Sequence, residues 1–248
     1  MKTGFVQNSN YEAMMEGIRY VERRGALEAG MMLVTGDNGL GKTKCIERYV
    51  ASSGALFVRA VSVHNKRSLL LSLASIDSSI SIKGSAKEIQ DAIIKYIVKS
   101  GDKPSIVIDE CQHLARGNSA AMLETVRDIS DKAECVVILV AGEIGFQHQL
   151  AKFKQISSRI AKHVQFKPMT LADTSNTVRQ LSDIIFDDAL LQELHKQSSG
   201  MIRQVIGAIN NLEGFAALNK RSSISLAEVT GKILCEEWQA QRPVRRGA

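Results

Sequence analysis

The sequence predicts an α/β fold, with a five-stranded parallel sheet flanked by helices and a small all-helical domain after it. Two observations support this prediction. Short apolar runs alternate with segments of helical period up to Pro168, and beyond that residue only helical periodicity remains. The predicted parts are a lead-in that packs on the core over residues 1–30, an α/β core over 31–168, a helical lid over 169–240 and a flexible basic tail over 241–248.

Each predicted element rests on a local pattern of apolar residues. The five apolar runs have the length and composition of buried strands. They cover Met31–Thr35, Leu56–Val61, Ser105–Asp109, Cys135–Ala141 and His163–Phe166. Apolar residues at helical spacing predict helices in the lead-in and core over residues 10–24, 45–52, 86–99 and 119–131. The same pattern predicts lid helices over residues 173–184, 189–198, 202–218 and 226–239.

Composition restricts the class of protein. The chain has 248 residues, of which 44% are hydrophobic, and this size suits one α/β core with a smaller appended domain. No apolar run approaches 18 residues, so we expect a cytoplasmic protein that makes no membrane contact. The four cysteines are scattered and form no C-x-x-C pair. The net charge of +6 is compatible with binding to nucleic acid but does not require it.

One segment has the complete G-x-x-x-x-G-K-[ST] pattern of a phosphate-binding loop. It follows the first predicted strand and precedes a predicted helix, which is the context that such a loop requires. Its glycines let the backbone approach phosphate oxygens, and its N–H groups point inward at the start of a helix. We therefore expect it to bind ATP through Gly36, Asp37, Asn38, Gly39, Leu40, Gly41, Lys42, Thr43 and Lys44.

Two carboxylates end the third predicted strand and complete the predicted site. Asp109 and Glu110 follow the apolar run Ser105–Ile108, at the strand edge that faces the ligand in parallel sheets. We expect Thr43 and Asp109 to hold Mg²⁺ and Glu110 to polarise a water in line with the γ-phosphate. A solvated strand end would explain the same pair without chemistry, but the preceding phosphate loop favours hydrolysis.

A nucleotide-binding core followed by a small helical lid resembles the layout of the AAA+ ATPases. The resemblance implies three further site residues. Arg203, in Ser199–Arg203, is similar to the lid arginine that reaches the γ-phosphate, and Glu143 stands where a polar sensor residue follows the fourth strand. Arg159 resembles an arginine finger supplied to a neighbouring subunit, with Lys154 and Arg127 as rival candidates.

Shorter motifs resemble one group within that superfamily, the transposition ATPases of the phage Mu B and TniB type. The motifs are Phe5–Ser9, Ile108–Leu114, Glu124–Asp131, Val140–Glu143 and Ser158–Ile160. This resemblance implies a DNA-binding ATPase in a bacterial host cell, encoded by a phage or a transposon. With ATP bound it would form a filament or ring of identical subunits on double-stranded DNA, and it would present that DNA to a DDE transposase. Hydrolysis would then release it.

Basic residues near the end of the second predicted strand are the candidate DNA contacts. The Mu protein has an additional N-terminal DNA-binding domain, whereas residues 1–30 alone precede the first strand here. We therefore expect the core itself to contact DNA phosphates, through Arg59, His64, Lys66 and Arg67. A solvated basic loop without a ligand is the alternative interpretation of these four residues.

Other functions remain open at the level of sequence. The nearest is a helicase-loader ATPase of the DnaC or IstB type, which shares the core but delivers a different partner. An ATP-switched scaffold of the STAND type would bind ATP and assemble without DNA. A metabolic P-loop kinase fits less well, because Asp109, Glu110 and Arg203 together favour hydrolysis.

Overall fold

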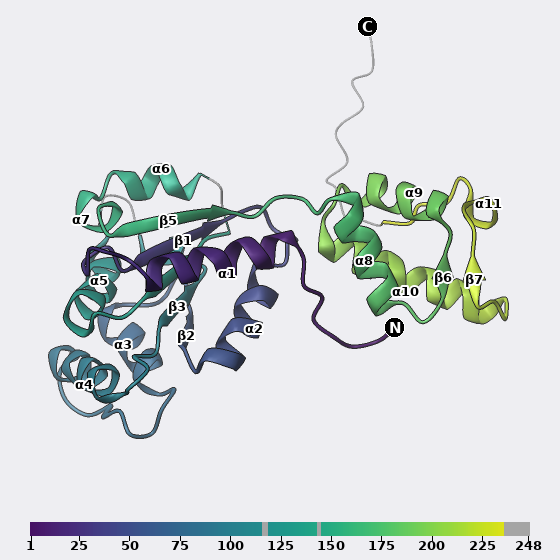
Figure 1. The fold of residues 1–248 in the computed structure, drawn as a ribbon. Helices are drawn as coiled ribbons and strands as arrows, with labels where there is room; N and C mark the ends of the chain where they lie inside the picture. Colours follow the sequence, from purple (N-terminus) through teal and green to yellow (C-terminus); the bar gives the residue numbers. More distant parts are fainter. Residues whose placement is uncertain (116–118, 143–144, 236–248) are drawn as a thin grey trace, which may run out of the picture. The chain divides into compact units, whose positions relative to one another are not determined.

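The computed structural model describes residues 1–115, 119–142 and 145–235, which form two compact units. Of the described residues, one unit holds those from Gln7 to Lys167, and the other holds Met1–Val6 together with those from Pro168 to Cys235. The chain therefore passes between the units twice, after Val6 and after Lys167. Figure 1 shows the elements of each unit along the chain.

The first unit contains a five-stranded parallel sheet, as the sequence predicts. Its strands are β1 (Met31–Thr35), β2 (Leu56–Arg59), β3 (Ile106–Asp109), β4 (Val137–Val140) and β5 (Ile160–Gln165). Their order across the sheet is β2-β3-β4-β1-β5, so the phosphate-loop strand β1 pairs with β4 and β5. Every residue of β1, β3 and β4 is buried, which explains why these strands read as continuous apolar runs.

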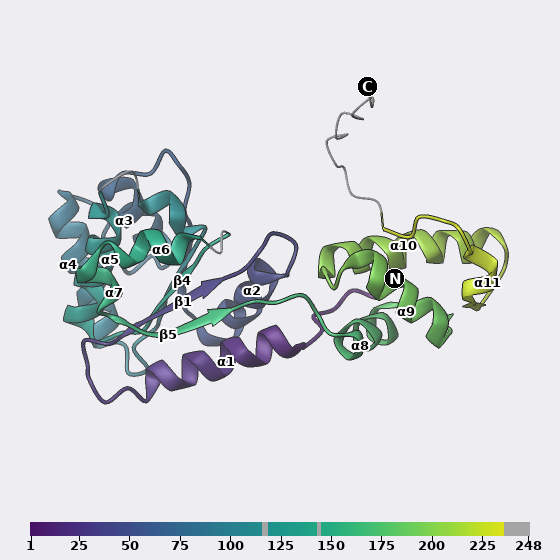
Figure 2. The ribbon, with the colours of Figure 1, turned by 90° about the horizontal axis from the view of Figure 1, so that it is seen from above.

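Helices cover both faces of this sheet. They are α1 (Ser9–Glu22), α2 (Lys42–Ser53), α3 (Lys66–Ala74), α4 (Ala86–Lys99), α5 (Ala121–Ala133), α6 (Phe146–Ala151) and α7 (Lys154–Ser157), with the short 3₁₀ helix η1 (Cys111–Leu114) after β3. Figure 2 shows α1 on one side of β1 and β5, and α3, α4 and α5 on the opposite side. The main core cluster joins those three helices to the strand residues that face them.

Helix α4 shows how local sequence sets an element. Ser85 caps its first turn, since its side chain accepts from the Glu88 N–H while the Glu88 carboxylate accepts from the Ser85 N–H. Ile89, Ile93 and Ile97 follow at helical spacing, and all three are fully buried. The cap and the apolar face together reproduce the predicted helix over residues 86–99.

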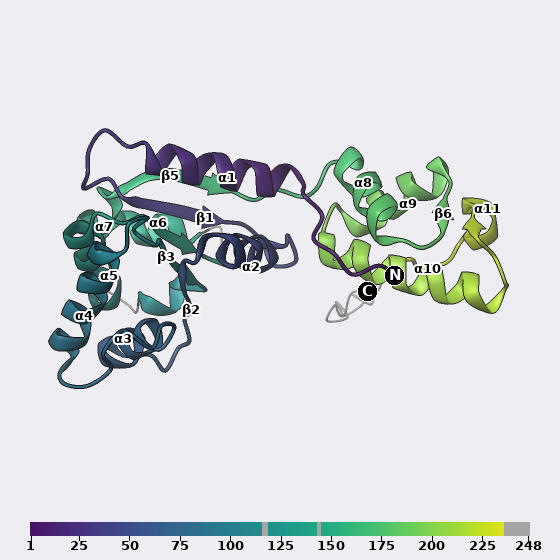
Figure 3. The same ribbon diagram turned by 60° about the horizontal axis from the view of Figure 1, so that its bottom comes forward.

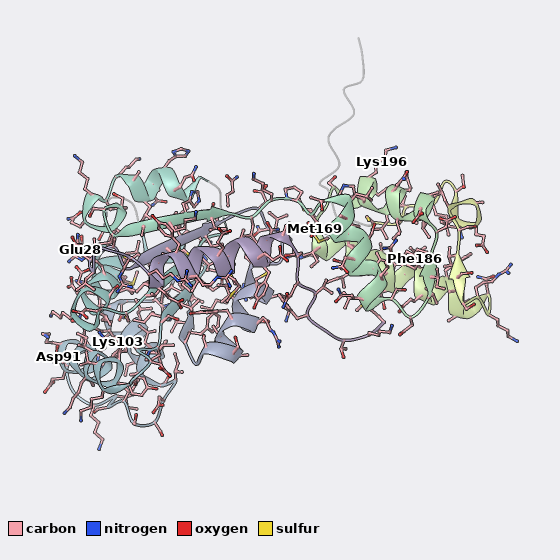
Figure 4. All side chains as sticks on the ribbon, in the orientation of Figure 1. Glu28, Asp91, Lys103, Met169, Phe186 and Lys196 are labelled. Carbon is pink, nitrogen blue, oxygen red and sulfur yellow. The ribbon has the colours of Figure 1, made fainter. Side chains whose placement is uncertain are left out.

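The second unit is a small helical domain with its own core. It contains α8 (Leu171–Leu181), α9 (Asp188–Ser198), α10 (Ile202–Leu218) and α11 (Leu226–Val229). Val6, Met169 and Phe186 belong to its buried cluster, and Figure 4 labels the last two. The prediction of an all-helical lid was wrong in one detail, because β6 (Ile185–Phe186) and β7 (Ser223–Ile224) form a short parallel pair. Two-residue strands are too short to give a periodic signal.

The boundary of the first unit is fixed by one buried side chain. Asn10 donates from Nδ2 to the Lys167 carbonyl at 2.7 Å and accepts from the Lys167 N–H at 2.9 Å through Oδ1. It therefore links the start of α1 to the segment that follows β5. Helix α1 itself lies beside β5 (Figure 3). Of the described residues, no helix is long and apolar enough to cross a membrane.

Candidate nucleotide-binding site

The phosphate loop connects the C-terminal end of β1 to the N-terminus of α2. Gly36 has a φ of 152°, and a Cβ at this position would lie 2.8 Å from the Cβ of Phe166. A side chain is therefore excluded by the close approach of the chain after β5. Gly41 is the N-cap of α2, so the first N–H groups of that helix border the loop. These groups form a positive site that suits phosphate oxygens.

Lys42 is held inside the loop that it would serve. Only 7% of the residue is exposed, and its Nζ donates to the carbonyls of Gly36 at 2.6 Å and Asp37 at 2.9 Å. The ammonium group thus lies within the curve of the loop, where it can exchange a carbonyl for a phosphate oxygen. Lys44, by contrast, has a side chain that is 77% exposed and pairs with Glu47.

The end of β3 lies directly beside the start of α2. The Thr43 hydroxyl donates to Oδ2 of Asp109 at 3.1 Å, and the Glu110 N–H donates to Oδ1 at 3.0 Å. Asp109 is 2% exposed. Burial raises the pKa of the Asp109 carboxyl, and the nearby charge of Glu110 adds to this, while the bond from Thr43 opposes it.

This pair fits a magnesium ion. Mg²⁺ takes oxygen ligands and is usually held by one or two protein oxygens together with water and substrate phosphates. Thr43 Oγ1 and the Asp109 carboxylate supply such oxygens next to the phosphate loop. Burial and the charge of Glu110 raise the pKa of Asp109 although the charge of Arg59 opposes them, and a bound cation would lower it. No group of three or more His, Cys, Asp or Glu residues elsewhere in the described chain forms a competing metal cluster.

Glu110 has a strained backbone and two side-chain partners. Its φ of 54° and ψ of 38° lie in the left-handed region, which costs a non-glycine residue about 1–3 kcal/mol. Gln112 donates from Nε2 to Oε2 at 2.6 Å, and Arg59 approaches Oε1 at 3.5 Å. Strain at a carboxylate that ends a parallel strand is typical of functional sites.

A polar hollow of about 290 Å³ opens beside this carboxylate. Glu110 and Gln112 form one wall, and Asn38 brings the phosphate loop to it. The remaining lining residues are Arg59, Ala60, Val61, His113 and Gly142. Phosphate loop, acidic strand end and hollow thus converge at one edge of the sheet, as expected for a ligand crevice in a parallel α/β fold.

Arg159 lies at the opposite edge of the sheet. It directly precedes β5, its carbonyl accepts from the N–H of Met31 at the start of β1, and its Nε donates to Asp131 at 3.1 Å. Met31 is the first of the five residues of β1, so five residue steps, about 16 Å at the usual rise, separate it from Gly36 at the start of the phosphate loop. Arg159 therefore cannot serve the phosphate loop of its own chain. Its rivals also lie outside the hollow: Arg127 pairs with Asp128, and Lys154 begins α7.

The described part of the first unit contains neither of the two remaining predicted site residues, Arg203 and Glu143. Arg203 is exposed in the first turn of α10 and belongs to the second unit, so its role stays a prediction. Glu143 lies outside the described residues.

The four predicted DNA contacts separate into two groups. Arg59 pairs in register with Asp109 across β2 and β3, and its side chain lines the hollow. His64, Lys66 and Arg67 follow on the loop and first turn that lead into α3, where Lys66 and Arg67 are exposed. Arg67 donates to the Gly84 carbonyl at 3.0 Å, and His64 accepts from the Val61 N–H at 3.2 Å. We call residues 59–67 the basic loop.

Sequence reasoning missed the role of Gln112. Its amide joins Glu110 to the main chain of Gly142, whose N–H donates to Oε1 at 3.2 Å. The only available signal was its place two residues after Glu110, which alone does not predict a contact with residue 142.

Comparison with known proteins agrees with this fold. Residues 25–150, just over half of the chain, match the family described as AAA domain. The chain therefore belongs to the AAA domain family. A search of curated proteins finds no match.

Several solved structures share the fold at low sequence identity. They include the ORC2 protein of Aeropyrum pernix in ADPNP–ADP complexes, with a TM-score of 0.62 and 19% identity over 86% of this chain and 64% of that one. The ORC1 protein of the same organism in complex with DNA gives 0.62 and 16%, over 88% and 63%. Cdc6p of Pyrobaculum aerophilum gives 0.61 and 17%, over 80% and 59%. This chain thus spans less than two thirds of those three proteins.

Proposed function

We propose that this protein is an ATPase whose ATP-bound form assembles on duplex DNA. The observation that carries the proposal is the convergence of Lys42, Thr43, Asp109 and Glu110 at one edge of the sheet, beside a polar hollow. A phosphate loop alone would support nucleotide binding. A buried magnesium-type carboxylate followed by a second carboxylate at the hollow supports hydrolysis as well.

Each residue has one task in this chemistry. Lys42 and the first N–H groups of α2 bind the phosphates and draw negative charge toward the helix start. Thr43 and Asp109 would hold Mg²⁺, and the ion would supply positive charge next to the phosphate oxygens. Glu110 would accept a hydrogen bond from the attacking water in the hollow and remove its proton as the water oxygen bonds to the γ-phosphorus. The bond from that phosphorus to the bridging oxygen breaks in the same step, and the oxygen leaves as part of ADP.

Hydrolysis in this proposal depends on a second copy of the chain. Among the described residues of the first unit, Lys42 lies within the phosphate loop and Arg59 lines the hollow. Arg59 is already beside Glu110. Arg159 of a neighbouring subunit would supply a guanidinium that stabilises the transition-state charge. Turnover would therefore rise on assembly, and Arg203 would report the γ-phosphate to the second unit.

Duplex DNA is the proposed template for that assembly. The basic loop offers His64, Lys66 and Arg67 as phosphate contacts next to the nucleotide hollow, and the chain is basic overall. One solved structure of similar fold, the ORC1 protein, is described in complex with DNA. The motif resemblance to the Mu B and TniB group supports the finer function, which is delivery of target DNA to a DDE transposase followed by release on hydrolysis.

The test compares assembly in three nucleotide states. The protein is mixed with duplex DNA and ATP, a slowly hydrolysed ATP analogue, or ADP, and its size is measured by sedimentation and negative-stain imaging. Filaments or rings that require both triphosphate and DNA are the expected result. Assembly with triphosphate but without DNA would favour the scaffold function, and no assembly in any state would favour the helicase-loader function.

A further inference from the structure

Gln112 is placed by a rigid local structure. It belongs to the 3₁₀ helix η1, whose first and last residues, Cys111 and Leu114, are 0% and 1% exposed. The His113 N–H donates to the Glu110 carbonyl at 3.0 Å, which closes the turn directly after the strained residue. The backbone of Gln112 is therefore fixed relative to Glu110 by buried anchors on both sides.

Of the two groups beside the Glu110 carboxylate, Gln112 has the better geometry. Its Nε2 lies 2.6 Å from Oε2, whereas the Arg59 guanidinium lies 3.5 Å from Oε1. The Arg59 side chain is also 60% exposed, so water screens that ion pair. Gln112 is thus the group that sets where the carboxylate points.

The other end of the amide reaches the neighbouring strand. Gly142 donates its N–H to Gln112 Oε1 at 3.2 Å, and the preceding Ala141 N–H donates to the Val34 carbonyl of β1 at 2.9 Å. A continuous series of hydrogen bonds therefore runs from the strand before the phosphate loop, through the end of β4, to the Glu110 carboxylate.

The glycine at position 142 makes room for this bridge. A Cβ there would lie 3.0 Å from Glu110 Oε2, 3.3 Å from Gln112 Nε2 and 3.4 Å from Asn38 Oδ1. Ala141 and Gly142, which directly follow β4, carry no polar side chain, and the polar side chain at this point comes from η1 instead.

We infer that Gln112 is a positioning residue of the hydrolytic site, which holds the Glu110 carboxylate in place and ties it to the end of β4. A glutamine amide has two N–H donors. One serves Glu110, and the second is available to a water or phosphate oxygen in the hollow that Gln112 lines. This inference rests on the proposed hydrolysis at Glu110, and it names the residue that keeps that group aligned.

The test measures kcat and KM for ATP separately, in the full chain with duplex DNA. Gln112→Ala should lower kcat by about 10- to 100-fold, since a small misplacement of a catalytic group costs that much, while KM and nucleotide affinity change less than about 3-fold. Gln112→Glu keeps an acceptor for the Gly142 N–H but loses the donor to Glu110, and it should lower kcat similarly. Gln147→Ala, a matched glutamine on α6 of the same unit, should match the wild type.

A double mutant separates positioning from a general loss of structure. In a Glu110→Gln background, Gln112→Ala should have no further effect on kcat, because the group that it positions is already lost. Unchanged kcat in Gln112→Ala, or an equal further loss in the double mutant, would overturn the inference alone. Absence of hydrolysis in the wild-type protein, under every assembly condition, would overturn the proposed function and this inference together.

Discussion

Thr43 donates its hydroxyl hydrogen to Asp109 Oδ2 at 3.1 Å, which joins the first turn of α2 to the end of β3. The acceptor is a carboxylate that is 2% exposed. Burial raises the pKa of Asp109, with Glu110 adding to the effect, so the negative charge is held at a cost in the ligand-free protein. The buried Asp109 carboxylate therefore lowers the folding stability of the ligand-free protein, and it provides a negative charge that can bind a cation.

Asp109→Asn should stabilise the protein at neutral pH and abolish hydrolysis. A raised folded-state pKa means that the native state holds the proton more tightly than the unfolded chain, so stability falls as pH rises from about 3.9 through the folded-state value. Asparagine carries no charge, so the variant does not lose stability at this position as the pH rises. Urea unfolding at several pH values should show a gain at pH 7 that shrinks as the pH is lowered. A variant that is less stable at pH 7, or a gain independent of pH, contradicts the argument.

Lys42→Ala should weaken ATP binding about 100-fold, while Lys44→Ala leaves it within about twofold. The two side chains belong to the same helix turn, but Lys42 is buried in the loop and Lys44 is 77% exposed and paired with Glu47. Loss of a charge-assisted contact to phosphate should raise Kd about 100-fold, or about 2.7 kcal/mol. Titration with a fluorescent ATP analogue measures both variants. Equal effects of the two substitutions would show that the loop geometry does not select Lys42.

The parts of the site that sequence predicts are those formed by adjacent residues. The phosphate loop and the acidic end of β3 each lie within one short segment next to a strand, so pattern and context suffice to predict them. The bridge from Gln112 to Gly142 joins residues 30 positions apart. It exists because β3 pairs in parallel with β4, Ile106 beside Val137, and no local pattern specifies that register.

Strand pairing also decides where Arg59 lies. The sequence indicates a basic residue at the end of a strand, and a phosphate contact to DNA is a natural interpretation. The parallel register of β2 with β3 places Arg59 beside Asp109, on the wall of the nucleotide hollow. His64, Lys66 and Arg67 follow after the strand ends, so that register does not determine their position. The DNA contact therefore stays a prediction for all four residues.

Glu110→Gln should bind ATP and DNA normally but hydrolyse slowly. The amide oxygen can still accept from Gln112 Nε2, so the local geometry is kept while the base is lost. Loss of a general base lowers kcat by about 10²- to 10⁴-fold. Phosphate release measures the rate, and sedimentation measures how long assemblies persist on DNA after free ATP is removed. Turnover close to the wild-type rate would exclude Glu110 as the base.

Lys66→Ala and Arg67→Ala should weaken DNA binding and leave nucleotide affinity unchanged. Both residues are exposed in the first turn of α3, and each removed phosphate contact should reduce the salt dependence of binding by about one unit of slope. Lys99→Ala, which removes an exposed lysine from the last turn of α4, is the matched control. Fluorescence anisotropy with labelled duplex DNA at several salt concentrations gives the slopes. Identical slopes for all three variants and the wild type would place the DNA contact elsewhere.

Arg159→Ala should spare ATP binding but lower hydrolysis by the assembled protein about 10³-fold. Its ion pair with Asp131 is a separate role. Asp131→Ala tests it by removing this pair, together with the longer contact of Asp131 to Arg127 at 3.9 Å, while keeping both guanidinium groups. Both variants should lose a similar, small stability, about 0.2–1 kcal/mol for a partly exposed pair. Only Arg159→Ala should lose turnover. Equal losses of turnover in both variants would assign the effect to the ion pair.

Mixing subunits distinguishes action within a chain from action between chains. Arg159→Ala and Glu110→Gln subunits are each inactive alone, but an interface that pairs an intact Glu110 with an intact Arg159 forms in the mixture. With random one-to-one assembly, head-to-tail contacts should restore about a quarter of the wild-type rate. Recovery would place Arg159 in the neighbour's site, which its position at the far edge of the sheet from the phosphate loop already favours. No recovery, with both variants present in the same assemblies, would leave Arg127 or Lys154 as the residue to test next.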